Sequence, residues 1–134
     1  MLKYNYADLL RPVTSGRNMN TGNQEIFALN VARLILFIFE KGYTCSFGEA
    51  YRTPEQAELN AKKGIGIKNS LHCKRLAVDL NLFTTTGKFS IDKKDYEQFG
   101  IYWEQLHDYN RWGGNFQRPD SDHFQMNPPE EEKK

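Results

Sequence analysis

The sequence predicts an α+β fold in which helices flank a small antiparallel sheet. An apolar stretch of helix length lies near the start, and short segments with alternating apolar and polar residues follow it. The two kinds of segment show no regular strand–helix rhythm, which disfavours a parallel sheet. The 134 residues are expected to form one domain over 1–134. The charged run that follows two prolines predicts a flexible tail over 127–134.

The overall composition excludes several classes of protein. Lys and Arg number 18 against 17 Asp and Glu, so the net charge of +1 gives no basic excess for binding nucleic acid. The longest apolar stretch, 26–39, is shorter than the roughly 20 residues that span a bilayer and contains Asn30 and Arg33. Two cysteines are too few for a disulfide scaffold. The first six residues do not resemble a secretory signal, so we expect none.

The first predicted helix covers 24–41 and follows a loop over 11–23 that is rich in Gly, Asn, Ser and Thr. Thr21 and Gln24 have the spacing of a capping box, and Gly42 supplies a stop signal at the other end. Because this helix is apolar nearly all round, we expect it to lie in the core or against a sheet.

Three segments are predicted to be strands. Residues 43–51 mix aromatic and small side chains, and residues 76–83 alternate polar with apolar residues. Residues 123–126 form a short final strand. The intervening segment 111–122 contains two consecutive glycines and a proline, and it is therefore predicted to be a loop.

Two further helices have clear start signals. Thr53 can cap a helix in which Pro54 takes the first position and Gln56 closes a capping box, and this helix should end before Gly64. Asp92 can cap the next helix. One face of that helix carries large apolar side chains, namely Tyr96, Phe99, Trp103 and Leu106.

Histidines and carboxylates form the chemical pattern of greatest interest. His72 precedes Asp79 by seven residues, and His123 follows far along the chain. The third histidine, His107, lies at helical spacing from Trp103 and is predicted to be a packed or surface residue. Seven residues span roughly 10 Å in a helix and roughly 23 Å in a strand. The chain must therefore turn between His72 and Asp79 if they share a metal. Two histidines and one carboxylate would leave one position open, as in a catalytic zinc site.

A second carboxylate lies close to the last histidine. Asp120 stands three residues before His123 and could take a proton from water and pass it to a leaving amine. Asp122 competes for this role, but as the neighbour of His123 on a strand it should point to the opposite face. On spacing alone, both the His–Asp and the Asp–His patterns are common by chance.

Four motifs together resemble one enzyme family. Residues 70–79 match Ser-x-His-x-x-Gly-x-Ala-x-Asp of the D-Ala-D-Ala carboxypeptidases and the VanY and VanX dipeptidases, except that Arg75 replaces the Gly. Residues 120–124 resemble the second motif of that family. Residues 51–56 and 112–114 resemble the segments that precede the two motifs. If the family Gly has a positive φ angle, an Arg would strain this turn.

The resemblance implies a hedgehog/D-Ala-D-Ala peptidase-like fold and a zinc-dependent peptidase that cuts peptidoglycan stem peptides. The short chain and the order of its motifs are similar to the bacteriophage endolysin branch, the L-alanyl-D-glutamate peptidases. The bond cut could be L-Ala-D-Glu or D-Ala-D-Ala. A non-catalytic zinc-containing module of the same fold, which binds cell wall or a protein partner, is the alternative.

The resemblance also implies roles for particular residues. Zn²⁺ would be bound by His72, Asp79 and His123, with Asp120 as the base and Arg52 stabilising the oxyanion. Ser70 would contact substrate or the ligand shell. Trp112 would line a substrate groove together with Phe116, although core packing is an equal possibility for these two aromatics.

Other expectations concern partners and location. Cys73 beside His72 leaves a structural Cys/His zinc site open, but Cys45 and Cys73 are predicted to be free thiols. The expected partners are peptidoglycan peptides, with no nucleic acid and no membrane span, and a monomer is favoured. A protein of this kind without a signal would be made in the cytoplasm and reach the cell wall through a holin.

Overall fold

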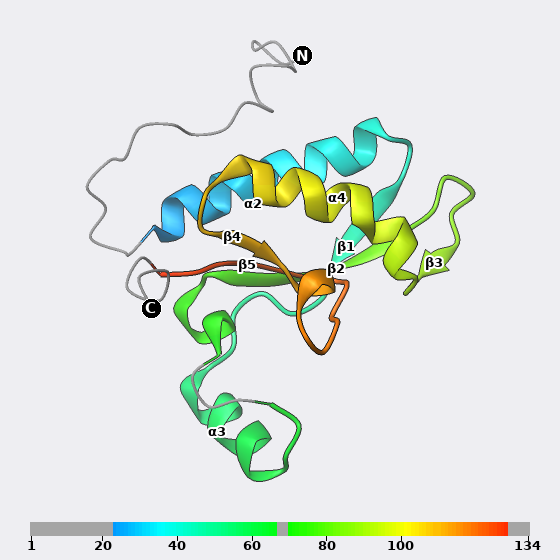
Figure 1. The fold of residues 1–134 in the computed structure, drawn as a ribbon. Coiled ribbons are helices and arrows are strands. Elements are labelled where there is room, and N and C mark those ends of the chain that lie inside the picture. Colours follow the sequence, from blue (N-terminus) through cyan, green and yellow to red (C-terminus); the bar gives the residue numbers. More distant parts are fainter. Residues whose placement is uncertain (1–22, 67–69, 129–134) are drawn as a thin grey trace.

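The computed structural model describes residues 23–66 and 70–128 and shows the predicted α+β architecture (Figure 1). Within these ranges the helices are α2 (Gln24–Glu40), α3 (Pro54–Lys62) and α4 (Lys93–Leu106), with short 3₁₀ turns η1 (Leu71–Lys74) and η2 (Gly113–Asn115). The strands are β1 (Thr44–Phe47), β2 (Ala77–Phe83), β3 (Phe89–Ser90), β4 (Asn110–Trp112) and β5 (His123–Met126).

The strands form one antiparallel sheet in the order β1-β2-β5-β4, and β3 pairs with the end of β2 on the edge opposite β1. Helices α2 and α4 lie next to each other on one side of this sheet, whereas α3 stands on the other side (Figure 1). Among the described helices, none combines the length and the apolar character that a bilayer span requires.

The core lies between the sheet and the two helices α2 and α4. On β2, alternate residues Val78, Leu80 and Leu82 are at most 2% exposed, as expected for side chains that point to one face of a strand. Trp103 of α4 is fully buried, and its indole N–H donates to the carbonyl oxygens of Arg111 (3.2 Å) and Gln125 (3.0 Å). This indole therefore fastens α4 to both β4 and β5.

Several predicted helix ends are confirmed. The Thr53 hydroxyl accepts a hydrogen bond from the Gln56 backbone N–H at 3.1 Å, and the Asp92 carboxylate accepts one from the Lys94 N–H at 3.0 Å. Gly42 follows the end of α2 with a φ angle of 81°, a conformation that favours glycine. These signals act locally, which explains why the sequence predicts them well.

Other predictions about elements were wrong in detail. The residue that precedes α2 is Asn23 and not Thr21, and the Asn23 side chain forms no capping hydrogen bond. Thr21 itself and residues 11–22 of the predicted loop lie outside the described residues. Helix α2 is also less buried than expected, since Leu29 and Phe39 are 44% and 49% exposed. Its buried stripe faces the sheet and α4, and the opposite side has no cover among the described residues.

Tertiary pairing accounts for the remaining differences. Strand β1 ends at Phe47 instead of residue 51, although Gly48 N–H still donates to the Asp79 carbonyl oxygen at 2.8 Å. Strand β4 covers part of the predicted loop because Trp112 pairs with Phe124 of β5. The tail predicted over 127–134 lies mostly outside the described residues, but Asn127 N–H donates to the Tyr109 carbonyl oxygen at 2.8 Å.

Candidate metal centre

Three separate elements bring His72, Asp79 and His123 together. His72 lies in η1, which starts where the Ser70 hydroxyl accepts a hydrogen bond from the His72 backbone N–H at 3.2 Å. Asp79 lies on β2 and is paired directly with His123 on β5, so both side chains share one face of the sheet. One ligand atom from each of the three residues lies within 4.8 Å of the others.

The turn between His72 and β2 depends on Arg75. Its φ and ψ angles of 58° and 36° are left-handed, the conformation for which glycine is usually selected. The Arg75 guanidinium lies 4.1 Å from the centre of the Tyr51 ring, a cation–π contact that offsets part of the strain. The chain thus reverses between His72 and Asp79, as a shared site requires, with an Arg in place of the family Gly.

The donor atoms fit a metal of the zinc type. His72 Nε2 lies 3.4 Å from Asp79 Oδ1, and His123 Nδ1 lies 3.1 Å from the same oxygen. Two imidazole nitrogens and a carboxylate oxygen are common ligands of catalytic zinc. His72 is 3% exposed, whereas Asp79 and His123 are half-buried and border an open groove. The arrangement therefore offers three ligands and access for a fourth.

Each imidazole has a partner on its other nitrogen. His72 Nδ1 lies 3.0 Å from the Ala50 carbonyl oxygen, which can only accept, so Nδ1 carries the hydrogen and Nε2 is left for a cation. His123 Nε2 lies 2.8 Å from Gln125 Oε1, and Nδ1 faces the site. Neither Ala50 nor Gln125 was predicted as a site residue. The Ala50 contact joins segments that are 22 residues apart, whereas Gln125 lies two residues from His123 on β5, so the shared strand face could have indicated it.

The three groups also shift one another's pKa. Burial alone would raise the pKa of Asp79, but hydrogen bonds from His123 and His72 and their charges lower it to about 2. Burial disfavours the charged form of His72, yet hydrogen bonds to Asp79 and to the Ala50 carbonyl raise the pKa of its imidazole. Asp79 is thus ionised at neutral pH, as a metal ligand must be.

Asp120 borders the same groove, which has a volume of about 530 Å³. A carboxylate oxygen of Asp120 lies within 4.8 Å of those of Asp79 and Asp122. Asp122 does not line this groove but a neighbouring cavity of about 270 Å³, which Asp120 also borders. The expectation that Asp122 points away from the site was wrong, because residue 122 precedes β5 and its carboxylate lies within 4.8 Å of that of Asp79. Burial, a hydrogen bond with Asp120 and the charge of Asp79 raise the pKa of Asp122 to about 7.

The position of Asp120 is fixed by the close approach of its backbone to that of Gly113. The Asp120 N–H donates to the Gly113 carbonyl oxygen at 2.9 Å, and the Asp120 carbonyl oxygen accepts from the His123 N–H at 3.1 Å. A Cβ atom at Gly113 would lie 2.2 Å from the Asp120 carbonyl oxygen, so a larger residue would push the Asp120 loop away. This explains the Gly that follows Trp112 in the segment 112–114, which precedes the second motif.

The remaining predicted site residues divide between the groove and the core. Arg52 and Ser70 line the groove, as does Phe116, whose ring centre lies 5.8 Å from that of His123. Trp112 does not, because it is 1% exposed and its indole N–H donates to the Ser121 carbonyl oxygen at 2.7 Å. Trp112 is a core residue, and the prediction that it contacts substrate has no support in this geometry.

Glu49 is a further residue that the sequence did not indicate. Arg52 Nε donates to Glu49 Oε2 at 3.1 Å, and Arg52 Nη2 forms a second bond to Oε1. Glu49 Oε1 also lies 3.8 Å from His72 Nε2. Glu49 thus holds the Arg52 guanidinium in the groove wall, close to the candidate ligands.

Both cysteines are free, as predicted. Cys45 packs against the core, and burial raises the pKa of its thiol to about 11. Cys73 lies beside His72 in sequence, but its sulfur lies 3.9 Å from the Thr53 carbonyl oxygen. Within the described residues neither group of clustered donors, whether His72, Asp79 and His123 or Asp79, Asp120 and Asp122, contains a thiol, which disfavours the structural Cys/His alternative.

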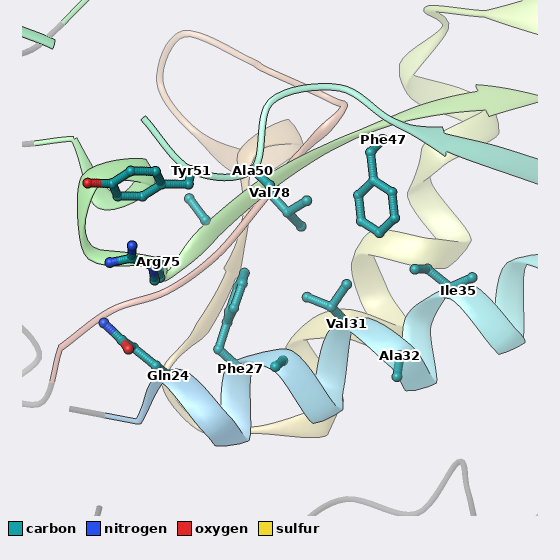
Figure 2. A pocket seen from close by; sticks show the side chains of 12 residues that line it. Gln24, Phe27, Val31, Ala32, Ile35, Phe47, Ala50, Tyr51, Arg75 and Val78 are labelled. Atoms are coloured by element: carbon teal, nitrogen blue, oxygen red, sulfur yellow. The ribbon is translucent and has the colours of Figure 1, made fainter. Parts of the chain in front are cut away.

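A separate apolar cavity of about 480 Å³ lies between α2 and the segment that follows β1 (Figure 2). Phe27, Val31 and Ile35 of α2 face Phe47 across it, and the Tyr51 ring and Arg75 lie together at one end (Figure 2). Its lining contains none of the candidate ligands or bases, so it is distinct from the candidate metal centre.

Comparisons with known proteins agree with this geometry. A family profile described as D-alanyl-D-alanine carboxypeptidase matches residues 64–126. The crystal structure of the L-Ala D-Glu endopeptidase ChiX from Serratia marcescens has 23% sequence identity and a TM-score of 0.61, covering 74% of this chain and 77% of its own. This likeness shows a shared fold. No curated protein matches the chain.

The matched segment contains both predicted motifs, with His72 and Asp79 in the first and Asp120 and His123 in the second. The predicted resemblance is therefore confirmed over this part of the chain, which matches the D-alanyl-D-alanine carboxypeptidase family profile.

Proposed function

We propose that the protein is a zinc-dependent peptidase that hydrolyses amide bonds of peptidoglycan stem peptides. The family match supports peptidase activity, and the name of the structurally similar Serratia enzyme supports peptidoglycan peptides as substrate. The observation that carries the proposal is the convergence of His72, Asp79 and His123 at a groove that also contains Asp120.

Zinc would be held by His72 Nε2, Asp79 Oδ1 and His123 Nδ1, the atoms that face one another. When bound, it would supply Lewis-acid chemistry that polarises the substrate carbonyl and makes water more acidic. The deeper position of His72 and the hydrogen bonds on the far side of each imidazole orient the ligands before metal binds.

Asp120 is the candidate general base. It is exposed at the groove, where its carboxylate can accept a proton from the attacking water and return it to the leaving amine. Asp122 is a poorer candidate, since it does not line the groove and is hydrogen-bonded to Asp120. That hydrogen bond holds the Asp120 carboxylate in place.

Arg52 is the candidate oxyanion-binding group. Its guanidinium lies in the groove wall and keeps its charge at any relevant pH. The two bonds to Glu49 prevent it from swinging out of the groove. Ser70 lines the same groove, but its hydroxyl already accepts a hydrogen bond from His72 N–H, so its main role is to shape the ligand turn.

Mass spectrometry of muropeptides tests the proposal. Cell walls are digested with zinc-loaded protein and, in parallel, with chelator-treated protein. We expect new peptide fragments only with zinc, and their masses would identify the bond that is cut. Binding to walls without any release of fragments would contradict the peptidase proposal and favour the non-catalytic module.

Asp120→Ala separates catalysis from metal binding. Loss of a general base typically costs about 10²- to 10⁴-fold in turnover, while zinc content should remain that of the parent protein. Asp122→Asn is the matched control, with a much smaller loss expected. If Asp120→Ala cleaves walls at nearly the parent rate, Asp120 is not the base.

An endolysin role and release by a holin remain predictions.

A further inference from the structure

One side chain outside the candidate ligands contacts the ring of His123 directly. Gln125 Oε1 lies 2.8 Å from His123 Nε2, on the opposite side of the ring from Nδ1, which faces Asp79 Oδ1 at 3.1 Å. The two residues are two positions apart on β5, so their side chains project from the same face of the strand. Gln125 also lines the groove.

We infer that Gln125 is a positioning residue that holds the His123 ring so that Nδ1, not Nε2, faces the metal. This inference rests on the proposed function, because it assigns Gln125 a role toward the proposed zinc. It adds a residue that neither the motifs nor the family match identified.

The orientation of the Gln125 amide is set by a second contact. Gln125 Nε2 donates to Asn127 Oδ1 at 2.5 Å, so the amide oxygen is the atom turned toward His123. Asn127 is itself held, since its backbone N–H donates to the Tyr109 carbonyl oxygen at 2.8 Å. A line of three side chains thus runs from Asn127 through Gln125 to His123.

The chemistry of a neutral imidazole gives this contact its consequence. Only one ring nitrogen carries a hydrogen, and the other has the lone pair that binds a metal. An amide oxygen at Nε2 stabilises the form with hydrogen on Nε2, which leaves the lone pair on Nδ1. Such a partner also raises the affinity of the imidazole for metal.

The two candidate histidine ligands differ in which ring nitrogen is left free to bind metal. At His72 the hydrogen-bonding partner is the Ala50 carbonyl oxygen at 3.0 Å from Nδ1, so the free lone pair is on Nε2. A backbone carbonyl holds His72, whereas a replaceable side chain holds His123. Substitution of Gln125 can therefore test the orientation of one ligand while the other keeps its partner.

Two alternative roles for Gln125 make different predictions. A residue that only contacts substrate would alter KM but not zinc affinity in the absence of substrate. A residue that only stabilises the strand would alter the unfolding free energy but not the tautomer of His123 in the folded protein. Zinc affinity and tautomer, both measured without substrate, therefore distinguish a positioning role from the other two.

The experiment compares Gln125→Met, which keeps the approximate size but removes the acceptor, with Gln125→Glu, which keeps an acceptor. Gln105→Met, on the exposed side of α4, is the control for the same chemical change. Zinc affinity is measured by competition with a chromogenic chelator. The tautomer of His123 is read from long-range ¹H–¹⁵N NMR spectra of the metal-free protein at a pH where the ring is neutral.

We expect Gln125→Met to bind zinc about 10- to 100-fold more weakly and to show a mixture of His123 tautomers. Gln125→Glu and Gln105→Met should retain the affinity of the parent protein and the Nε2–H form. If Gln125→Met keeps both the parent affinity and the Nε2–H form, the inference is overturned. A parent protein that binds no zinc would instead contradict the proposed function.

A second variant covers the case in which Gln125→Met does not fold. Asn127→Ala leaves Gln125 in place but releases its amide, so we expect a smaller loss of zinc affinity and partial loss of the Nε2–H form. Parent-like values for both measurements in this variant would count against the line of contacts from Asn127 to His123.

Discussion

The two faces of β2 differ in how their side chains are held. Toward the helices, Val78, Leu80 and Leu82 are at most 2% exposed and pack in the apolar core. On the other face, Asp79 is half-buried and is held by His72 and His123 through hydrogen bonds and charge. One strand thus contributes to the core and to the candidate metal centre, because successive side chains point in opposite directions.

This difference predicts a separation of stability from metal binding. Burial of apolar and aromatic groups supplies most of the free energy of folding, whereas half-buried polar contacts contribute about 1 kcal/mol each. Substitutions on the core face should therefore unfold the protein, and substitutions on the site face should abolish function in a folded protein. The following predictions test this, beginning with the largest effect.

Trp103→Ala tests the core face. Trp103 is fully buried, packs edge-to-face on Phe27 and Phe124, and donates hydrogen bonds to two carbonyl oxygens. Removal of a buried Trp costs about 3–5 kcal/mol of unfolding free energy, measured by urea denaturation of the metal-free protein. Ile101→Ala on the exposed side of α4 is the control. A loss below about 1 kcal/mol would show that this indole is not central to the core.

Asp79→Asn tests the site face. The amide is a poor metal ligand, so zinc content should fall to the background of a metal-free sample while the far-ultraviolet circular dichroism spectrum stays unchanged. The unfolding free energy of the metal-free protein should fall by only about 2 kcal/mol, about 1 kcal/mol for each of its hydrogen bonds to His72 and His123. Asn81→Asp, on the same face and two residues along, is the control for a change of charge. If Asp79→Asn lowered the unfolding free energy as much as Trp103→Ala does, the two faces of β2 would not differ in their contribution to stability.

Arg75 tests the turn that connects His72 to β2. Its left-handed conformation costs about 1–2 kcal/mol for a non-glycine residue, and its contact with the Tyr51 ring returns about 0.5–1 kcal/mol. Arg75→Gly removes both effects and should change the unfolding free energy by less than about 1 kcal/mol. Arg75→Ala keeps the strain and loses the contact, so it should be the less stable of the two. The opposite order would mean that the strain is negligible.

His107 tests pH dependence on the side of the sheet away from the candidate metal centre. Burial lowers the pKa of its imidazole, and its Nδ1 accepts a hydrogen bond from the Tyr109 N–H at 3.1 Å. The unfolded chain therefore binds a proton more readily, so the stability from His107 is present above pH about 6.5 and is lost as the pH falls below it. In urea titrations of the metal-free protein from pH 7.5 to 5, His107→Gln should lose less stability than the parent. Identical pH profiles would show that His107 titrates normally.

Much of the fold follows from local signals in the sequence. Thr53 and Asp92 begin helices because each side chain bonds a backbone N–H only two or three residues away. The alternation in β2 already separates Asp79 from the apolar residues around it. The motif resemblance also selected His72, Asp79 and His123, which the structure brings within ligand distance. Such features depend on near neighbours along the chain or on residue types at short spacing.

The sequence by itself therefore determined the α+β class, the main helices and the three candidate ligands. Only the tertiary structure decided the ends of β1 and β4, the placement of Trp112 in the core, and the contacts of Glu49 and Gln125 near the candidate ligands. The strand ends and the burial of Trp112 arise where segments far apart in sequence meet. Glu49 and Gln125 bond to residues only two or three positions away, but these contacts lie near the candidate ligands only because His72, Asp79 and His123 converge there. Because a shift of one residue in strand pairing turns every side chain to the other face, the three-dimensional register decides them and local sequence does not.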